Sequence, residues 1–273
     1  MVIHAPAPVA GPGYSENSLR HLASHTWVLT GRLLLRESRT PMTILHALIL
    51  PVIFLLTVKI VLGDSVTTLT GENGLYRSVP LVTLVGAITG STAGVVDLMA
   101  ERSAGFLARL HVLPLHRAAD LFSRLTGEAV RLVLTSLIVL ATGLALGLRF
   151  HRGVAQTVVW LAIPVAFGLA FSVLVLTIAL YWQKSVLVEA IQVFALVATF
   201  FCTGLVPLDQ YPNWVQPLVE YQPLSPAVDA MRAVAVGGPV QWPLTITAAW
   251  CLGIVLVCLW PLLVGYRRAS TNR

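Results

Sequence analysis

The residues able to carry out chemistry are few in this sequence, and they form no catalytic pattern. The seven histidines are scattered, and neither an H-E-x-x-H metal motif nor a G-x-S-x-G nucleophile elbow is present. The two lysines, Lys59 and Lys184, follow valine and glutamine, so the sequence lacks the G-K-[ST] loop that cradles nucleotide phosphates. The three cysteines lie in apolar stretches and fit no metal or disulfide spacing. We expect no cofactor or metal on this chain, and no ATP hydrolysis by it alone.

Ionisable residues close to the long apolar stretches are also rare. His46, Lys59, Asp97 and Glu189 each fall near the end of such a stretch, where headgroup contact or snorkelling satisfies a charge. The sequence therefore predicts no charged pair in the middle of a membrane span, and no proton relay.

The amino-acid composition indicates the class of protein and the kind of helices that must position these residues. Hydrophobic residues make up 56% of the 273 positions and charged residues only 11%, against about 25% charged residues in a soluble domain. So much apolar surface cannot be buried in a soluble globule of this size. We predict an all-α integral membrane protein and exclude a soluble enzyme and a nucleic-acid-binding chain. The net charge of +6 is assigned to cytoplasmic loops and anionic headgroups.

Six stretches are long and apolar enough to cross a bilayer about 30 Å thick. They are Thr43–Leu62, Val79–Met99, Leu132–Leu148, Val154–Trp182, Val186–Val206 and Leu244–Tyr266. With the N-terminus inside, thirteen cations fall in inner segments and only four in outer ones. The inner cations are Arg20, Arg32, Arg36, Arg39, Arg102, Arg109, Arg117, Arg124, Arg131, Lys184, Arg267, Arg268 and Arg273. The outer cations are Arg77, Arg149, Arg152 and Arg232. This positive-inside bias predicts a multi-pass protein of the cytoplasmic (inner) membrane with both termini in the cytoplasm.

The chain before the first span divides into two parts. Residues 1–17 are rich in proline, glycine and alanine and predict a disordered tail. Residues 18–40 predict an amphipathic helix on the inner membrane surface, in which Leu22, Trp27, Val28, Leu29, Leu33, Leu34 and Leu35 form the apolar side. The cations Arg32, Arg36 and Arg39 would contact headgroups. A membrane anchor and a docking site for a partner both remain open. Residues 41–268 then form the transmembrane domain, and 269–273 a cytoplasmic tail.

The segment between the second and third spans is long and basic. Its residues show helical spacing up to Pro114, which breaks the helix, and a second helical stretch runs from Arg117 to Arg131 into the third span. Together these features predict a bent elbow of two helices. It is either a solvated inner loop or the surface that receives a cytoplasmic protein. Gly86, Gly90 and Gly94 in the second span are interpreted as helix-packing positions rather than as a ligand site.

The segment Pro207–Pro243 combines seven prolines with apolar residues. Ser225-Pro226 predicts a helix N-cap followed by proline at the first helical position, and Gly237 predicts the C-cap. We expect one or two short helices that dip into the outer leaflet, with Trp214 and Leu218 on a buried apolar face. Such a segment either gates substrate release or merely covers the helix bundle.

Three stretches of this chain resemble the permease subunits of ABC-2-type exporters, in the daunorubicin-resistance branch. The first contains Arg32–Arg36, Arg39–Pro41, Leu50-Pro51 and Gly63. The second contains Asp97–Gly105, Arg109, Leu113-Pro114, Arg117 and Ser123-Arg124. The third contains Thr203–Pro207, Tyr211–Trp214, Gln222–Pro226 and Arg232. The resemblance extends from about Leu29 to near the C-terminus.

The resemblance implies a half-transporter with six spans and no nucleotide site of its own. Its partners would be two copies of a cytoplasmic ABC ATPase, which hold ATP and Mg, and a second permease, a related but distinct chain. The implied coupling interface with the ATPase contains Glu101, Arg102, Gly105, Arg109, Pro114 and Arg117. The implied outer re-entrant helices contain Pro207, Pro212, Trp214, Leu218, Pro223, Pro226 and Arg232. The implied substrate is hydrophobic: a complex lipid such as phthiocerol dimycocerosate, or an anthracycline-like drug. It would be exported from the membrane.

Two other classes of function were weighed against an ATP-driven exporter. An ion-coupled carrier or channel without an ATPase needs a charged pair or a half-helix site in the middle of the membrane. A lipid-modifying intramembrane enzyme needs a clustered nucleophile or metal set. The sequence offers none of these features. Substrate-contacting residues are not indicated by any pattern.

Overall fold

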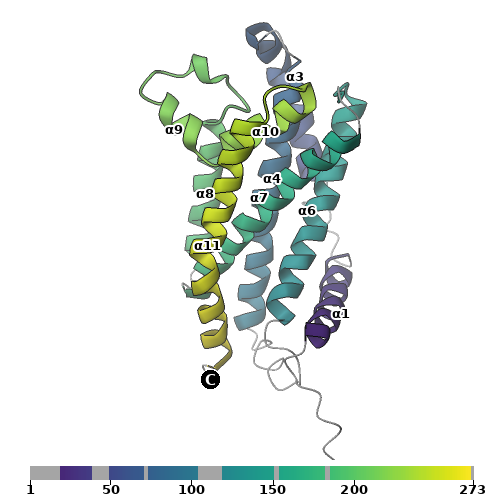
Figure 1. Cartoon of the computed structure of the whole chain (residues 1–273), viewed down its shortest axis with the longest axis vertical. Coiled ribbons are helices and arrows are strands. Elements are labelled where there is room, and N and C mark those ends of the chain that lie inside the picture. Colours follow the sequence, from purple (N-terminus) through teal and green to yellow (C-terminus); the bar gives the residue numbers. More distant parts are fainter. Residues whose placement is uncertain are drawn as a thin grey trace, which may run out of the picture.

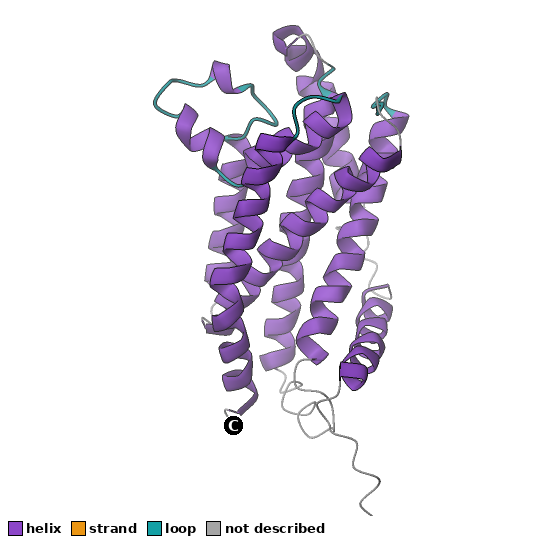
Figure 2. Cartoon of the chain, viewed as in Figure 1, coloured by secondary structure: helices purple, strands orange, loops and turns teal. Residues whose placement is uncertain are grey.

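The computed structural model describes residues 19–38, 49–70, 73–103, 119–150, 154–181 and 185–271, and within these ranges the regular structure is entirely helical (Figure 2). The helices are α1 (Leu19–Ser38), α3 (Leu50–Thr70), α4 (Leu75–Ser103), α6 (Ala119–Ala145), α7 (Val154–Tyr181), α8 (Ser185–Phe200), η2 (Leu208–Gln210), α9 (Gln216–Tyr221), α10 (Leu224–Val236) and α11 (Gln241–Thr271). The all-α prediction is confirmed for the described part of the chain.

Long helices run side by side to form one elongated bundle (Figure 1). Helices α4 and α7 are central: α4 contacts α3, α6, α7, α8 and α10, while α7 contacts α4, α6, α8, α10 and α11. The short helices α9 and α10 lie at one end of the bundle, and α1 and the end of α11 lie at the other (Figure 1). We call these the α10 end and the C-terminal end.

Four of the described helices contain a stretch long and apolar enough to cross a membrane: Leu75–Val96, Asp120–Ala145, Ala155–Tyr181 and Gln241–Leu262. The apolar parts of α3 and α8, Leu50–Val61 and Glu189–Phe200, are shorter. The fifth predicted span was expected to reach Val206, but its helix ends at Phe200. The third was expected over Leu132–Leu148, after a helical stretch from Arg117 to Arg131. Helix α6 contains both in one helix that begins at Ala119, and it ends earlier than expected, at Ala145. This ending precedes a turn in which Gly147 has a φ of 109°, a conformation that favours glycine.

The apolar core of the bundle has two sections. The section toward the α10 end contains Val79, Val82, Val139 and Trp160, packed against buried residues of α10. The section toward the C-terminal end contains Leu98, Leu121, Leu176 and Leu262. On α4, α6 and α7 these sections are separated by polar residues and glycines, which are the subject of the next subsection.

Helix α1 packs against α6, where the Thr30 hydroxyl donates a hydrogen bond of 3.3 Å to the Ser123 carbonyl. The predicted single apolar side is not what the structure has. Trp27, Val28 and Leu35 are exposed, whereas Leu29, Leu33 and Leu34 are half-buried. The apolar residues are divided because α6 covers one side of α1 and leaves the other open.

The segment after α8 contains η2, α9 and α10, in agreement with the short helices expected there. The predicted cap at the end of α10 is confirmed: Gly237 has a φ of 87° and donates its N–H to the Ala233 carbonyl at 2.9 Å. The predicted N-cap at Ser225 is wrong. Helix α10 begins at Leu224, and the N-cap is Pro223, which makes no side-chain capping bond.

Helices α4, α6 and α7 approach closely where α7 carries Gly168. A Cβ at this position would lie 2.7 Å from Leu132 Cδ2 and 3.2 Å from Ala87 Cβ, and Leu132 is buried. We predict that Gly168→Ala lowers the free energy of unfolding by about 1–3 kcal/mol through overpacking. Denaturant unfolding of the purified protein in detergent measures this effect.

The matched control is Gly127→Ala on α6, where an added Cβ meets nothing within 4 Å. That change should be neutral or stabilising by up to about 1 kcal/mol, because alanine favours the helix. Equal stability of the two variants would show that α7 does not approach its neighbours as described.

Candidate functional site: a buried ion pair between three helices

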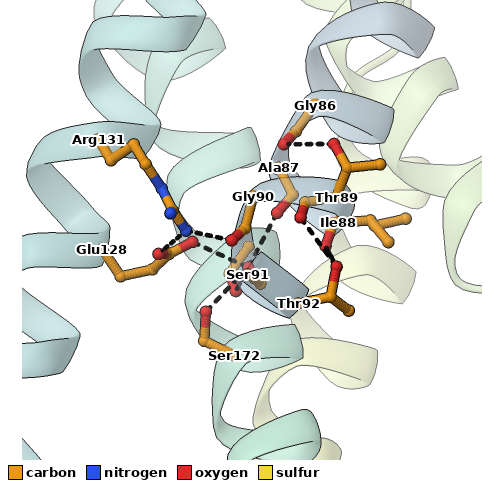
Figure 3. Close-up of polar contacts among 11 residues, drawn as sticks. Gly86, Ala87, Ile88, Thr89, Gly90, Ser91, Thr92, Glu128, Arg131 and Ser172 are labelled. Atoms are coloured by element: carbon orange, nitrogen blue, oxygen red, sulfur yellow. Dashed lines mark hydrogen bonds and ion pairs between the residues drawn. The ribbon is translucent and has the colours of Figure 1, made fainter. Parts of the chain in front are cut away.

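Five residues in the interior of the described bundle form a layer joined by polar contacts, which we call the polar layer. It consists of Gly90 and Ser91 on α4, Glu128 and Arg131 on α6, and Ser172 on α7 (Figure 3). It lies between the two apolar core sections: on α4 it follows Ile88 and precedes Val95. Charged groups within an apolar stretch are costly and therefore mark candidate functional sites.

Glu128 and Arg131 form an ion pair one turn apart on α6. Arg131 Nη2 donates to Glu128 Oε2 and also to the Gly90 carbonyl of α4. Only 11% of the Arg131 side chain and 9% of the Glu128 side chain are exposed. One guanidinium thus neutralises the carboxylate and ties α6 to the α4 backbone.

Ser91 and Ser172 complete the layer on the carboxylate side. Ser91 Oγ lies 3.0 Å from Glu128 Oε1, 2.8 Å from the Ala87 carbonyl and 3.1 Å from the Gly168 carbonyl, and it accepts a hydrogen bond of 2.8 Å from Ser172 Oγ. A hydroxyl has one proton to donate, and an ionised carboxylate is the strongest of the three acceptors. Both oxygens of Glu128 therefore have a donor within the layer (Figure 3).

The missing side chain at Gly90 gives Arg131 its room. A Cβ on Gly90 would lie 3.4 Å from Arg131 Nη2 and 3.5 Å from Cζ, at the edge of ordinary contact. A Cβ on Gly94 would lie 3.8 Å from both Arg131 Nη2 and Glu128 Oε2. These two glycines therefore do more than let helix backbones meet, since they form the slot that receives the ion pair.

The sequence patterns did not reveal this site. Arg131 was interpreted as a loop cation because the third span was expected to begin at Leu132, and no pairing with Glu128 was expected. The structure places both residues inside α6, in a stretch, Asp120–Ala145, that is long and apolar enough to cross a membrane. That no charged pair lies in the middle of a span stays a prediction. The signal was present as opposite charges three residues apart, which face each other on a helix. An average of hydropathy does not detect such pairing.

A second polar cluster lies at the α10 end. Arg77, in the first turn of α4, donates from Nη1 to the Thr203 carbonyl at 2.8 Å. The Thr203 hydroxyl donates to Asp229 Oδ2 at 3.0 Å, and the Thr203 N–H donates to Ser225 Oγ at 3.3 Å. The cluster thus joins α4, the turn after α8, and α10. Sequence analysis gave Asp229 no role and counted Arg77 only as an outer cation.

The electrostatics of this cluster centre on Asp229. Burial raises the pKa of the Asp229 carboxyl, while the hydrogen bond from Thr203 and the cations Arg77 and Arg232 oppose that rise. Asp229 is therefore a carboxyl held in place by a donor and two neighbouring cations.

The residues of the implied coupling interface fall at the end of the described part of α4 or beyond it. Glu101 and Arg102 belong to the last turn of α4. Gly105, Arg109, Pro114 and Arg117 lie outside the described residues. On the interfacial helix, Arg32 is exposed and Arg36 belongs to α1, whereas Arg39 lies outside the described residues.

The structure brings only some of the predicted outer residues together. Pro207 and Pro226 are buried, Pro223 and Arg232 are half-buried, and Pro212 is exposed. Trp214 and Leu218 are 84% and 69% exposed, so the expectation that they lie on a buried face is wrong for the single chain. Val215 and Val219 are buried instead, because they occupy the side of this segment that faces the bundle.

Comparisons with known proteins identify the family. The family model for the ABC-2 type transporter matches residues 24–236. The chain is 47% identical over 266 residues to the "Probable doxorubicin resistance ABC transporter permease protein DrrC" of Mycobacterium tuberculosis, covering 97% of this chain and 96% of the relative. It is 23% identical over 235 residues to the "Daunorubicin resistance ABC transporter permease protein DrrB1" of Streptomyces coeruleorubidus, covering 86% and 81% of the two chains. The resemblance found from the sequence is confirmed.

The ion pair predicts an asymmetric response to mutation. Arg131→Met leaves the Glu128 carboxylate buried without a cation and should lower the free energy of unfolding by about 3–5 kcal/mol. The double variant Glu128→Leu/Arg131→Met removes both charges and should recover most of that loss. Denaturant unfolding of each variant in the same detergent measures these effects.

The control is the ion pair between Arg124 and Asp120, two positions one turn apart near the start of α6, whose charged groups lie 3.2 Å apart with side chains 12% and 18% exposed. Arg124→Met should cost less than Arg131→Met, because Asp120 lies in the first turn of α6, where the helix N-terminus stabilises a carboxylate that has lost its cation. Equal losses from Arg131→Met and Arg124→Met would contradict a special role for the buried pair.

Proposed function

The chain belongs to the ABC-2 transporter family, and from this we propose that it is the permease subunit of an ATP-driven exporter. Its relatives are transport components rather than enzymes, and apolar helices make it a multi-pass membrane protein. A separate cytoplasmic ATPase, in two copies, supplies the energy, and a second, related permease completes the pathway. The observation that carries this proposal is the match to a resistance permease over 97% of the chain.

The proposed coupling interface is the elbow Glu101–Arg117, between α4 and α6. Supporting this choice, α4 ends at Ser103 and α6 begins at Ala119, so the elbow connects two helices that share the polar layer. Glu101 and Arg102 have the charges for hydrogen bonds to the ATPase, each contributing about 1.5–3 kcal/mol. Arg32, Arg36 and Arg39 belong to the same cytoplasmic side in this proposal, where they contact anionic headgroups.

The proposed gate for release is the outer segment Pro207–Gly238. Trp214 and Leu218 are exposed in the single chain. In the assembled exporter we propose that they lie on the surface that closes the exit path and contact the second permease, lipid or substrate. Pro207, Pro212, Pro223 and Pro226 fix the backbone of this segment, and the charge of Arg232 favours the ionised form of the Asp229 carboxyl. The hydrogen bonds between Thr203 and α10 anchor one part of the segment, so that the rest of it can move relative to this point.

The proposed substrate is hydrophobic, either a complex lipid such as phthiocerol dimycocerosate or an anthracycline-like drug. The names of two relatives refer to resistance to doxorubicin and to daunorubicin. Large apolar side chains are exposed on α8 and on α11, among them Phe194, Phe200, Leu256 and Trp260. Such surfaces suit contact with lipid or an apolar ligand.

Six crossings of the cytoplasmic membrane, with both termini in the cytoplasm, are part of the proposal. With 16 residues, α8 is about 24 Å long, less than the apolar thickness of a bilayer of about 30 Å. We propose that the outer segment completes this crossing as re-entrant helices, since broken backbone at such depth must be sheltered by neighbouring helices.

The topology is tested by single cysteines at Ser15, Asn73 and Thr271, after the three native cysteines are replaced. A membrane-impermeant thiol reagent applied to intact cells should label the Asn73 position and leave the other two unlabelled. Labelling at Ser15 without labelling at Asn73 would invert the proposed orientation.

The coupling role of the elbow predicts a specific effect of Glu101→Lys. The reversed charge should leave membrane insertion intact, while association with the ATPase weakens or hydrolysis continues without export. The measurements are co-purification of the ATPase and ATP-dependent export at equal expression. Export at the unaltered rate would remove this residue from the coupling interface.

The alternative function, an ion-coupled carrier, requires charged residues inside the membrane. The buried Glu128–Arg131 pair is such a feature, and it was not recognised from the sequence. Within the described helices, however, both oxygens of Glu128 already accept hydrogen bonds, which leaves no evident acceptor for a transported proton. Extraction of the chain from its native membrane in mild detergent separates the two functions. An exporter should bring an ATPase with it, whereas a carrier driven by an ion gradient should bring none and should keep transporting in ATP-depleted vesicles.

A further inference from the structure

Helix α4 is attached to its neighbours by polar contacts at two levels. Near its middle, the Gly90 carbonyl accepts from Arg131, and Ser91 lies 3.0 Å from Glu128. In its first turn, Arg77 Nη1 donates to the Thr203 carbonyl at 2.8 Å. Arg77 and Gly90 are thirteen residues apart in one continuous helix, a distance of about 20 Å along its axis.

The outer attachment reaches the whole segment after α8. Thr203 bonds to Ser225 and Asp229 of α10. Gln222, at the end of α9, donates to Ser225 Oγ at 3.0 Å and to the Phe201 carbonyl. The Tyr211 hydroxyl lies 3.2 Å and 3.3 Å from the Phe200 and Cys202 carbonyls. The carbonyls of the last residue of α8 and of the two residues after it thus accept from the outer segment, which α4 holds through Arg77.

The inner attachment resists sliding of α4 against α6. A shift of α4 by one residue would move the Gly90 carbonyl away from Arg131 and bring a residue with a Cβ opposite the guanidinium. Both charges would then lose partners while remaining buried, and buried charges persist only when paired. A displacement of α6 is therefore carried by α4 rather than absorbed between the two helices.

We propose that α4 is a strut that carries displacement from the inner ends of α4 and α6 to the outer segment, and that Arg131 and Arg77 are positioning residues at its two attachments. The proposal rests on the export function proposed above and adds to it the route by which ATP hydrolysis reaches the outer gate. The competing interpretation is that both polar clusters only hold the bundle together.

The test follows the outer segment directly in the assembled complex. The chain, with its native cysteines replaced by alanine, is co-purified with its ATPase and placed in lipid nanodiscs. Spin labels are attached to cysteines introduced at Glu220 on α9 and Val158 on α7, both of which are exposed. Electron–electron resonance measures the distance between the labels without nucleotide and with Mg-ATP plus vanadate. In the otherwise unaltered chain we expect ATP to shift this distance.

Two sets of variants then interrupt the strut. Glu128→Leu/Arg131→Met removes the inner attachment without leaving an unpaired charge, and Arg77→Gln weakens the outer one. Each should lose the ATP-dependent shift while the complex still assembles and hydrolyses ATP. Combining them should cause no further loss, because either break interrupts the same route. Distant sites with independent roles would instead give additive effects.

The matched control is Asp120→Leu/Arg124→Met, which removes the other ion pair described on α6, near the start of that helix. It should keep the full shift. The proposal is overturned if the double variant at Glu128 and Arg131 keeps the shift, if the control loses it equally, or if ATP produces no shift in the unaltered chain. Failure of any ATPase to co-purify overturns the proposed export function itself, and a working ATPase with no effect of the variants overturns only the strut.

Discussion

An ion pair buried in an apolar bundle must have every strong donor and acceptor satisfied, and the arrangement of α4, α6 and α7 depends on this constraint. Glu128 and Arg131 meet it only because α4 offers the Gly90 carbonyl and the Ser91 hydroxyl at the same level, while α7 adds Ser172. Removing one partner of such a pair is far more damaging than removing both. The pair therefore specifies how the three helices align as well as holding them together.

The same constraint explains the division of the core. Two apolar sections lie on either side of the polar layer, and glycines occur where the guanidinium and the neighbouring helices need space. Apolar packing alone would tolerate several alignments of long helices, because apolar contacts have little directionality. The directional hydrogen bonds of the polar layer favour a single alignment. In the exporter proposed above, a unique alignment gives the proposed ATPase a defined group of helices to move.

Much of the fold was available from the sequence, and the site was not. Apolar runs located six helices, and the glycine cap after α10 followed from Gly237, because both features are local. A helix starting near Arg117 was expected, and α6 begins at Ala119. The apolar stretch within it was expected to start only at Leu132, because hydropathy counts Glu128 and Arg131 as costs and ignores their pairing. Ser225 was misassigned because its hydroxyl bonds to Thr203, 22 residues earlier in the chain. Trp214 and Leu218 looked buried by type, and only the packed structure shows that Val215 and Val219 face the bundle. Long-range partners of polar groups are what one sequence does not reveal.

An experimental density map of the assembled complex in a lipid nanodisc, at a resolution that shows side chains, tests the central claim most directly. The account predicts that the Arg131 guanidinium lies within hydrogen-bond distance of both the Gly90 carbonyl and the Glu128 carboxylate, inside the bundle and out of contact with headgroups. A map in which Arg131 turns toward the lipid headgroups or the cytoplasm, with Glu128 bonded elsewhere, would contradict it.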